Sequence, residues 1–207
     1  MQGRFITMEG GEGAGKSTMM ERVSDWLERS GQRVVSTREP GGTVLAEKLR
    51  DILLDRNNLL LSGKAELLLM FAARAQHLDE RIRPALARGD WVLCDRFTDA
   101  TWAYQGGGRG LAREDIEALE TLVHGDLQPD LTLLLDLPVE QGMLRASNRS
   151  RADRFEQESM DFFKRVRKAY LERAAMAPAR FAVIDASKGQ EEVWAQIQAI
   201  LQNRLVS

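Results

Sequence analysis

The run from Gly10 to Ser17 constrains the fold more than any other part of the sequence, because it follows the pattern glycine, any four residues, glycine, lysine, serine. A short apolar segment, Phe5 to Met8, precedes the run, and a helix-forming segment, Lys16 to Arg29, follows it. A strand, a glycine-rich loop and a helix in this order surround one point with backbone N–H groups and the positive end of a helix dipole. The sequence therefore predicts a loop that binds phosphate.

Two side chains at the end of the run have expected roles in this loop. Lys16 would reach between the terminal phosphates as a point charge, and the Ser17 hydroxyl would take one position on a magnesium ion. A chance match to the pattern arises in on the order of one in a hundred chains of this length. The flanking strand and helix favour the phosphate-binding interpretation over a chance turn.

Composition narrows the class of protein. With 207 residues, 43% of them hydrophobic, the chain can bury one substantial core, and a single domain over 1–207 is expected. A formal charge of -2 carries no basic excess of the kind that nucleic-acid binders use. The single cysteine, Cys94, lies in an apolar segment and is expected to fill the core. Neither a signal peptide nor an apolar run of membrane length is expected, which predicts a cytoplasmic protein without a membrane partner.

Short apolar runs alternate with helix-length segments along the chain, as in βαβ units. The runs read as almost continuously apolar, which is typical of strands in a parallel sheet covered by helices on both faces. The sequence therefore predicts an α/β fold with a five-stranded parallel sheet. The expected strands are Phe5 to Met8, Val34 to Thr37, Trp91 to Cys94, Leu131 to Leu137 and Phe181 to Ile184.

Two features predict interruptions of the helices. Pro84 predicts a break near Arg83, after a helix over Lys64 to Glu80. The glycine cluster from Gly106 to Gly110 predicts a loop or hinge after a helix over Thr98 to Tyr104. The cluster is too short to be a linker between domains.

Ligands of such sheets lie beyond the carboxyl ends of the strands. Asp95 ends the third apolar run, where a carboxylate can assist magnesium directly or through water; a helix cap or an ion pair with Arg96 is the alternative. Arg38 and Arg96 would bring two planar guanidinium groups to the same edge, where they can clamp a second phosphate. Two phosphate sites imply two nucleotides.

A further arginine-rich stretch, from Arg145 to Arg154, has weak helical character in its middle. It predicts a lid at about 146–156 that closes and brings a guanidinium group, Arg149 first among them, onto the transferred phosphoryl. A solvated basic helix face is the alternative interpretation.

Together these residues resemble bacterial thymidylate kinases along most of the chain. The matching segments are Gly10 to Ser17, Thr37 to Thr43, Asp95 to Gly110, Pro129 to Asp136 and Arg145 to Phe163. The resemblance implies a transferase of nucleotide biosynthesis with the fold of P-loop nucleoside monophosphate kinases. It would move the γ-phosphoryl of ATP, with magnesium, to deoxythymidine monophosphate (dTMP) and give the diphosphate (dTDP). It also implies a homodimer.

The resemblance implies roles for individual residues. Glu12 would contact the acceptor sugar near its 3′-hydroxyl, Tyr104 would fill the space of a ribose 2′-hydroxyl, and Arg74 would bind the thymine edge. The implied catalytic residues are Lys16, Arg149, Arg96 and Glu12, and the implied metal-linked residues are Ser17 and Asp95. The implied ATP-binding residues are Gly10, Gly11, Glu12, Gly13, Ala14, Gly15, Lys16, Ser17, Thr18 and Arg145. The implied dTMP-binding residues are Glu12, Arg38, Glu39, Pro40, Met70, Phe71, Arg74, Arg96, Thr101, Tyr104 and Gln105.

The chain departs from the family pattern at one position. Family members usually have phenylalanine four residues before the base-binding arginine, and this chain has Met70 there, followed by Phe71. One residue rotates a helical side chain by about 100°, so the sequence leaves open which of the two covers thymine. The apolar stripe Leu67, Met70, Phe71 and Leu78 could serve the core or a dimer interface.

Three alternatives remain beside the thymidylate kinase interpretation. The acceptor could be another nucleoside monophosphate or a deoxynucleoside. A P-loop switch that binds guanine nucleotides would need an Asn-Lys-x-Asp run, which the sequence lacks. A DNA-linked ATPase would usually be a larger chain.

Overall fold

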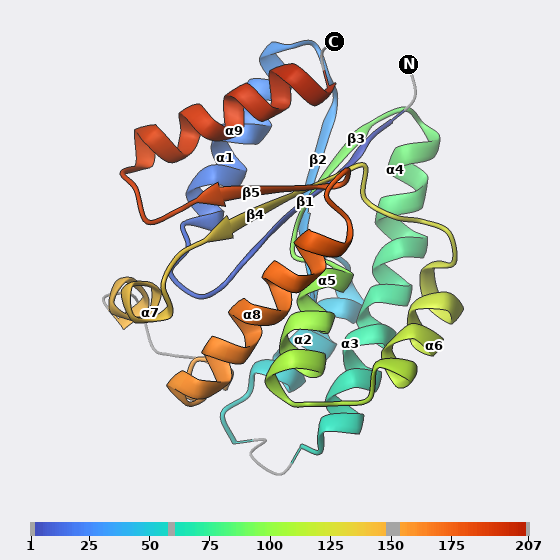
Figure 1. Ribbon diagram of the computed structural model, residues 1–207. Coiled ribbons are helices and arrows are strands. Elements are labelled where there is room, and N and C mark those ends of the chain that lie inside the picture. Colours follow the sequence, from blue (N-terminus) through green and yellow to red (C-terminus); the bar gives the residue numbers. More distant parts are fainter. Residues whose placement is uncertain (1–2, 58–60, 148–153, 206–207) are drawn as a thin grey trace.

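A five-stranded parallel sheet with the strand order β2-β3-β1-β4-β5 forms the centre of the protein (Figure 1). The computed structural model describes residues 3–57, 61–147 and 154–205. The strands are β1 (Phe5–Gly10), β2 (Val34–Arg38), β3 (Trp91–Asp95), β4 (Leu131–Asp136) and β5 (Phe181–Asp185). The predicted α/β class and parallel sheet are thus confirmed, with small differences at the strand ends.

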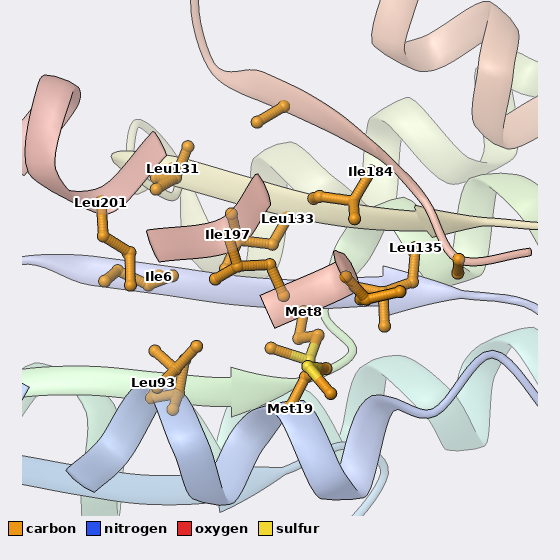
Figure 2. Packing of buried hydrophobic residues seen from close by; sticks show 14 of the residues in the cluster. Ile6, Met8, Met19, Leu93, Leu131, Leu133, Leu135, Ile184, Ile197 and Leu201 are labelled. Carbon is orange, nitrogen blue, oxygen red and sulfur yellow. The ribbon is translucent and has the colours of Figure 1, made fainter. Parts of the chain in front are cut away.

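The alternation of side chains along β1 explains why helices cover both faces of the sheet. Ile6 and Met8 belong to a core with α1 (Lys16–Arg29) and α9 (Gln190–Leu205), and Figure 2 shows them near Met19 of α1 and Ile197 of α9. Phe5 points to the opposite face and packs with Phe97. Because successive side chains of a strand point to opposite faces, a central strand needs apolar partners on both.

Most of the remaining helices lie on the second face of the sheet (Figure 1). They include α8 (Met160–Met176), α3 (Gly63–His77) and α4 (Arg83–Ala87), with α5 (Thr98–Thr101) and the π-helical η2 (Trp102–Gly108). The helices α2 (Val44–Leu54) and α6 (Arg113–His124) both pack against α3, while α7 (Val139–Ser147) follows β4. No described helix combines the length and the apolar character that crossing a bilayer demands.

The predicted break at Pro84 is wrong. The chain remains helical from α3 through a π-helical turn, η1 (Leu78–Ile82), into α4. Pro84 stands in the first turn of α4, where its missing N–H is tolerated. Leu78 and Ile82 are fully buried beneath the sheet, so η1 contributes to the core.

The predicted loop at the glycine cluster is wrong for its first part, because Gly106, Gly107 and Gly108 lie within η2. A β-carbon on Gly107 would lie 2.5 Å from the β-carbon of Ala169, and one on Gly108 would lie 2.5 Å from the ring of Phe162. Ala169 and Phe162 belong to α8. These glycines therefore allow η2 and α8 to pack closely.

Candidate active site

A cavity of about 260 Å³ lies at the carboxyl ends of β1 and β3. Residues 12–17 of the phosphate loop form one wall, and residues 95–97, at the end of β3, adjoin it. Several residues that the resemblance implies for dTMP also line it: Met70, Arg74, Thr101 and Gln105 for the base, and Tyr104 for the sugar. One cavity therefore joins the loop to the expected base-binding side chains.

The phosphate loop has the geometry that an anion site requires. Gly15 stands at the N-cap of α1 in the left-handed region (φ 87°), and no side chain caps this helix within the described chain. The first N–H groups of α1 are therefore left for a ligand. Lys16 donates from Nζ to the carbonyl oxygens of Gly10 (3.2 Å) and Gly11 (3.0 Å). Burial lowers the pKa of Lys16, and the positive charge of the nearby Arg96 lowers it further.

Arg96 points back over the phosphate loop from the end of β3. Its backbone is left-handed (φ 68°), a conformation that costs a non-glycine residue about 1–3 kcal/mol. Nη1 donates to the carbonyl oxygen of Gly10 (2.9 Å) and to the Tyr170 hydroxyl (3.1 Å), and Nη2 donates to Oε1 of Glu12 (2.9 Å). The Tyr104 hydroxyl donates to the same oxygen of Glu12 (2.7 Å). Arg96, Glu12 and Tyr104 thus form one connected group.

Asp95 has an oxygen that suits a metal ion. Its Oδ1 is buried and has no hydrogen-bond partner among the described residues. Ser17 lines the same cavity. The described part of the chain holds no cluster of three or more histidine, cysteine or acidic residues that could bind a metal alone. Magnesium in kinases uses one or two protein ligands with substrate phosphates, so Asp95 and Ser17 fit that group.

Arg74 is fixed at the other end of the cavity by a buried carboxylate. Nε donates to Oε2 of Glu39 (2.7 Å), and Nη2 donates to the Thr101 hydroxyl (3.1 Å). His77 Nδ1 lies 2.9 Å from the second oxygen of Glu39. Burial acts to raise the pKa of Glu39, but the Arg74 charge and the His77 hydrogen bond leave it below its ordinary value. Glu39 is therefore an ionised support for Arg74.

The structure separates Met70 from Phe71. Met70 lines the cavity, whereas Phe71 is 2% exposed and packs with Leu67 and Trp102. The Arg74 guanidinium lies 4.8 Å from the centre of the Phe71 ring. Phe71 thus supports Arg74 from the core, and Met70 is the one of the two side chains that faces the cavity.

Not all predicted residues meet at this cavity. Glu39 and Pro40 line it, but Arg38 lies outside, 55% exposed, with Nη2 donating to Glu47 (3.0 Å). Arg38 instead shares a shallow groove with Ser17 and Asp95.

The described arginines of the arginine-rich stretch lie in different environments. Arg145 donates to the carbonyl oxygens of Ala186 (2.8 Å) and Ser187 (3.2 Å), between β5 and α9. Arg154 is buried and donates to Glu66 (2.7 Å) and to the Leu53 carbonyl (2.8 Å). Arg149 and most of the predicted lid lie outside the described residues.

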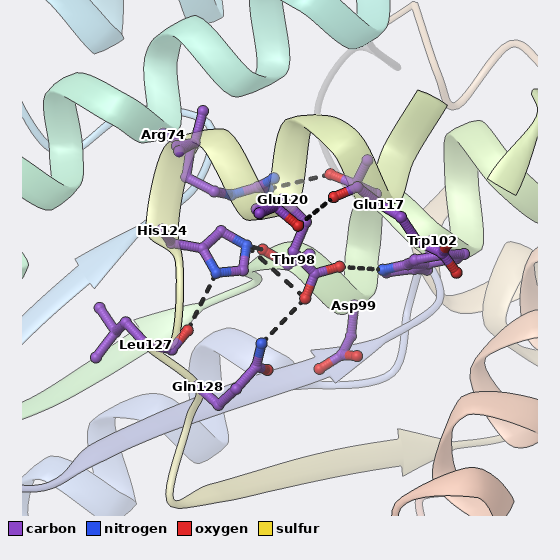
Figure 3. A network of polar contacts seen from close by, with 12 residues as sticks. Arg74, Thr98, Asp99, Trp102, Glu117, Glu120, His124, Leu127 and Gln128 are labelled. Carbon is purple, nitrogen blue, oxygen red and sulfur yellow. Dashed lines mark hydrogen bonds and ion pairs between the residues drawn. The ribbon is translucent and has the colours of Figure 1, made fainter. Parts of the chain in front are cut away.

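A polar network behind the cavity wall holds α6 against α5 and η2 (Figure 3). His124 Nδ1 lies 3.1 Å from the Leu127 carbonyl, which can only accept, so Nδ1 carries the proton and Nε2 accepts from the Thr98 hydroxyl (2.9 Å). Burial lowers the pKa of His124, which agrees with a neutral ring. Trp102 donates to Glu120 (2.8 Å). These bonds support the two segments that carry Thr101, Tyr104 and Gln105.

Sequence reasoning missed several residues of the site. Tyr170 accepts a hydrogen bond from Arg96 and donates one to Glu9. Glu66 holds Gln105, and Gly142 of α7 touches the backbone of the phosphate loop. The sequence does contain a signal for Glu9, because a carboxylate in a buried strand before a phosphate loop needs hydrogen-bond or charge partners nearby. Gly142 gives another, because a glycine inside a helix costs about 1 kcal/mol relative to alanine.

Comparison with known proteins agrees with this geometry. The family model described as thymidylate kinase matches residues 8–197. The chain is 62% identical over 207 residues to the thymidylate kinase of Chromohalobacter salexigens, covering 99% of this chain and 98% of that one. It is 56% identical over 202 residues to that of Alcanivorax borkumensis, covering 98% and 97%. A crystal structure of thymidylate kinase from Ehrlichia chaffeensis superposes with a TM-score of 0.79 at 34% identity, covering 98% and 99%. The chain belongs to the thymidylate kinase family.

Proposed function

We propose that this chain transfers the γ-phosphoryl of ATP to the 5′-phosphate of dTMP and releases dTDP and ADP. The observation that carries the proposal is the single cavity that joins the phosphate loop, Arg96 and the wall around Arg74. Family membership supports the same reaction.

The donor binds on the phosphate loop. The N–H groups at the start of α1 hold the phosphates, and Lys16 exchanges its bonds to the Gly10 and Gly11 carbonyls for the terminal phosphate oxygens. Ser17 and Asp95 are the residues that would hold magnesium, which when bound neutralises charge on those oxygens. Arg145 lies on this side, beside the loop between β5 and α9.

The acceptor phosphate binds beside Arg96. Because Arg96 is tied to both Gly10 and Glu12, its guanidinium places an acceptor next to the phosphoryl that the loop holds. The acceptor is already an anion near neutral pH, with a second pKa of about 6, so no general base is needed. Arg38 joins this site by leaving its exposed pair with Glu47, and such pairs contribute only about 0–1 kcal/mol.

Glu12 and Tyr104 face the sugar. The Tyr104 hydroxyl is held against Glu12 at 2.7 Å, and both residues line the cavity. Tyr104 therefore occupies the space beside the carboxylate that a ribose 2′-hydroxyl would need, while Glu12 accepts from the 3′-hydroxyl.

The lid and the oligomeric state complete the proposal. We propose one domain over 1–207; the lid expected at about 146–156, with Arg149 as its catalytic arginine, lies mostly outside the described residues and stays a prediction from the sequence. The enzyme is a homodimer, in which a second copy covers the exposed apolar residues Val44 and Leu45 of α2 and Leu68 of α3. Leu67, Phe71 and Leu78 of the predicted stripe are buried within the chain and serve its core.

An ADP-release assay across acceptors tests the reaction. With ATP and magnesium, dTMP is expected to give a much higher kcat/KM than dUMP, dCMP, dAMP, dGMP or thymidine. Lys16→Ala is the control. It should lower kcat by about 100-fold or more, because it removes the positive charge that stabilises the negative charge developing on the transferred phosphoryl. A better rate with another acceptor, or ATP hydrolysis that needs DNA and no acceptor, would overturn the proposal.

A further inference from the structure

Glu66 is a fully buried carboxylate on α3 that contacts side chains from two other segments. Oε1 accepts from Nε2 of Gln105 (2.8 Å) and Nε of Arg109 (3.2 Å). Oε2 accepts from Nη2 of Arg109 (3.2 Å) and Nη2 of Arg154 (2.7 Å). Both carboxylate oxygens are thus occupied, and two guanidinium groups compensate the buried charge.

The bond to Glu66 fixes which way the Gln105 amide points. An ionised carboxylate can only accept hydrogen bonds, so the amide nitrogen of Gln105 must face Glu66. Gln105 is 1% exposed and lines the cavity. Its amide oxygen is therefore the polar atom left to face a ligand.

Arg74 supplies the opposite polarity in the same cavity. Its Nε and Nη2 bind Glu39 and Thr101, and its buried Nη1 has no hydrogen-bond partner among the described residues. Since guanidinium groups only donate, the cavity offers a fixed donor from Arg74 and a fixed acceptor from Gln105. Each is held by a buried carboxylate, Glu39 or Glu66.

A donor from Arg74 and an acceptor from Gln105 match the hydrogen-bonding edge of thymine and not that of cytosine. Thymine has an N3–H donor beside the O4 acceptor, whereas cytosine has an N3 acceptor beside an amino donor. A ligand that leaves a buried polar group of the site without a hydrogen-bond partner binds much more weakly than one that satisfies it. A fixed amide oxygen at Gln105 therefore accepts from thymine N3–H and meets a lone pair on cytosine.

We propose that Glu66 is a positioning residue that sets base specificity by fixing the orientation of the Gln105 amide. The inference rests on the proposed dTMP kinase reaction. Glu66 touches neither nucleotide, and its effect passes through Gln105.

Glu66→Gln tests the inference, because an amide at position 66 can donate as well as accept and lets Gln105 turn over. We expect the ratio of kcat/KM for dCMP to that for dTMP to rise by about tenfold or more. KM for dTMP rises, while KM for ATP stays unchanged. The base ratio is a readout that a loss of stability alone does not move.

Glu158→Gln is the matched control. Glu158 pairs with Arg109 at the outer, partly exposed end of the same cluster, and Arg109 keeps its bonds to Glu66. This variant should keep the wild-type base ratio. In a Gln105→Leu background, Glu66→Gln should change the base ratio no further, because coupled residues are not additive.

The outcomes separate the two proposals. A folded Glu66→Gln enzyme with the wild-type base ratio would overturn the role of Glu66, as would an equal change in Glu158→Gln. If Glu66→Gln does not fold, Glu66→Gln combined with Arg154→Gln keeps the buried charge balanced and takes its place. A wild-type enzyme that does not phosphorylate dTMP would instead overturn the proposed function.

Discussion

Glu9 ends the apolar part of β1 and lies beneath Arg96. Its Oε1 accepts from the backbone N–H of Phe97 (2.7 Å), and its Oε2 accepts from the Tyr170 hydroxyl (2.7 Å). Tyr170 in turn accepts from Arg96 (3.1 Å). Burial raises the pKa of Glu9 to about 8, and the negative charge of Asp99 is the second largest cause of this increase. At neutral pH, a carboxyl group that is close to its own pKa thus supports Arg96, the arginine proposed to hold the acceptor phosphate.

The raised pKa of Glu9 predicts how stability depends on pH. Between its ordinary pKa of 4.5 and about 8, the folded protein holds a proton that the unfolded chain releases, so rising pH favours unfolding. The Glu9 contribution to the free energy of unfolding should fall across this window, by at most about 1.4 kcal/mol per pH unit. Urea unfolding at several pH values, compared with Glu9→Gln, measures it. Parallel curves for the two proteins would contradict the raised pKa.

At the scale of residues, sequence predicts the members of the site that belong to a local pattern. Lys16, Ser17 and Arg96 stand at fixed places in or after an apolar run, and the structure puts them in one cavity. Glu66 could not be predicted, because its partners Gln105, Arg109 and Arg154 lie 39, 43 and 88 residues away. Only the packing of helices brings such a cluster together.

At the scale of elements, α7 packs directly against the phosphate loop. A β-carbon on Gly142 would collide with the carbonyl oxygen of Glu12, and one on Gly13 would collide with the carbonyl oxygen of Gly142. Both atoms are backbone, so neither can move aside cheaply. The position of α7 is therefore coupled to the shape of the loop.

Gly142→Ala should weaken ATP binding although alanine favours helix formation by about 1 kcal/mol. The added methyl group overlaps the loop, and overpacking of this kind costs about 1–3 kcal/mol. KM for ATP should rise on the order of tenfold, with a smaller change for dTMP. Leu144→Ala, at an exposed position of the same helix, should leave both unchanged. An unaltered KM for ATP in Gly142→Ala would show that the loop shifts freely.

Strands were easier to predict than the helices after β3. The central strands β1, β3 and β4 are mostly buried and apolar because helices cover both faces, so the apolar run itself identifies them. In η2 the glycines indicated a loop, since glycine disfavours helices when only local propensity is considered. The close approach of α8 through Ala169 and Phe162 decides the outcome there, and no local pattern contains that contact.

At the scale of the whole molecule, the exposed apolar residues of α2 and α3 predict self-association. Val44 is 79%, Leu45 48% and Leu68 57% exposed, on helices that pack together. Sedimentation velocity at micromolar concentration should give the mass of a dimer, and Leu68→Glu should shift it toward the monomer. Met176→Lys, at a 65% exposed position of α8, is the control and should remain dimeric. A monomeric wild-type protein would contradict the prediction.

The strand order has a consequence for how specificity can change. The sheet has β2 and β3 on one side of β1 and β4 and β5 on the other, so the phosphate loop, which follows β1, lies at its centre. Apart from Glu12, the residues proposed to bind dTMP fall within 38–105. Changes within this one continuous stretch of gene can therefore alter the acceptor preference while the phosphate loop is inherited unchanged, provided that Asp95, proposed to hold magnesium, and Glu66, the partner of Arg154, are kept.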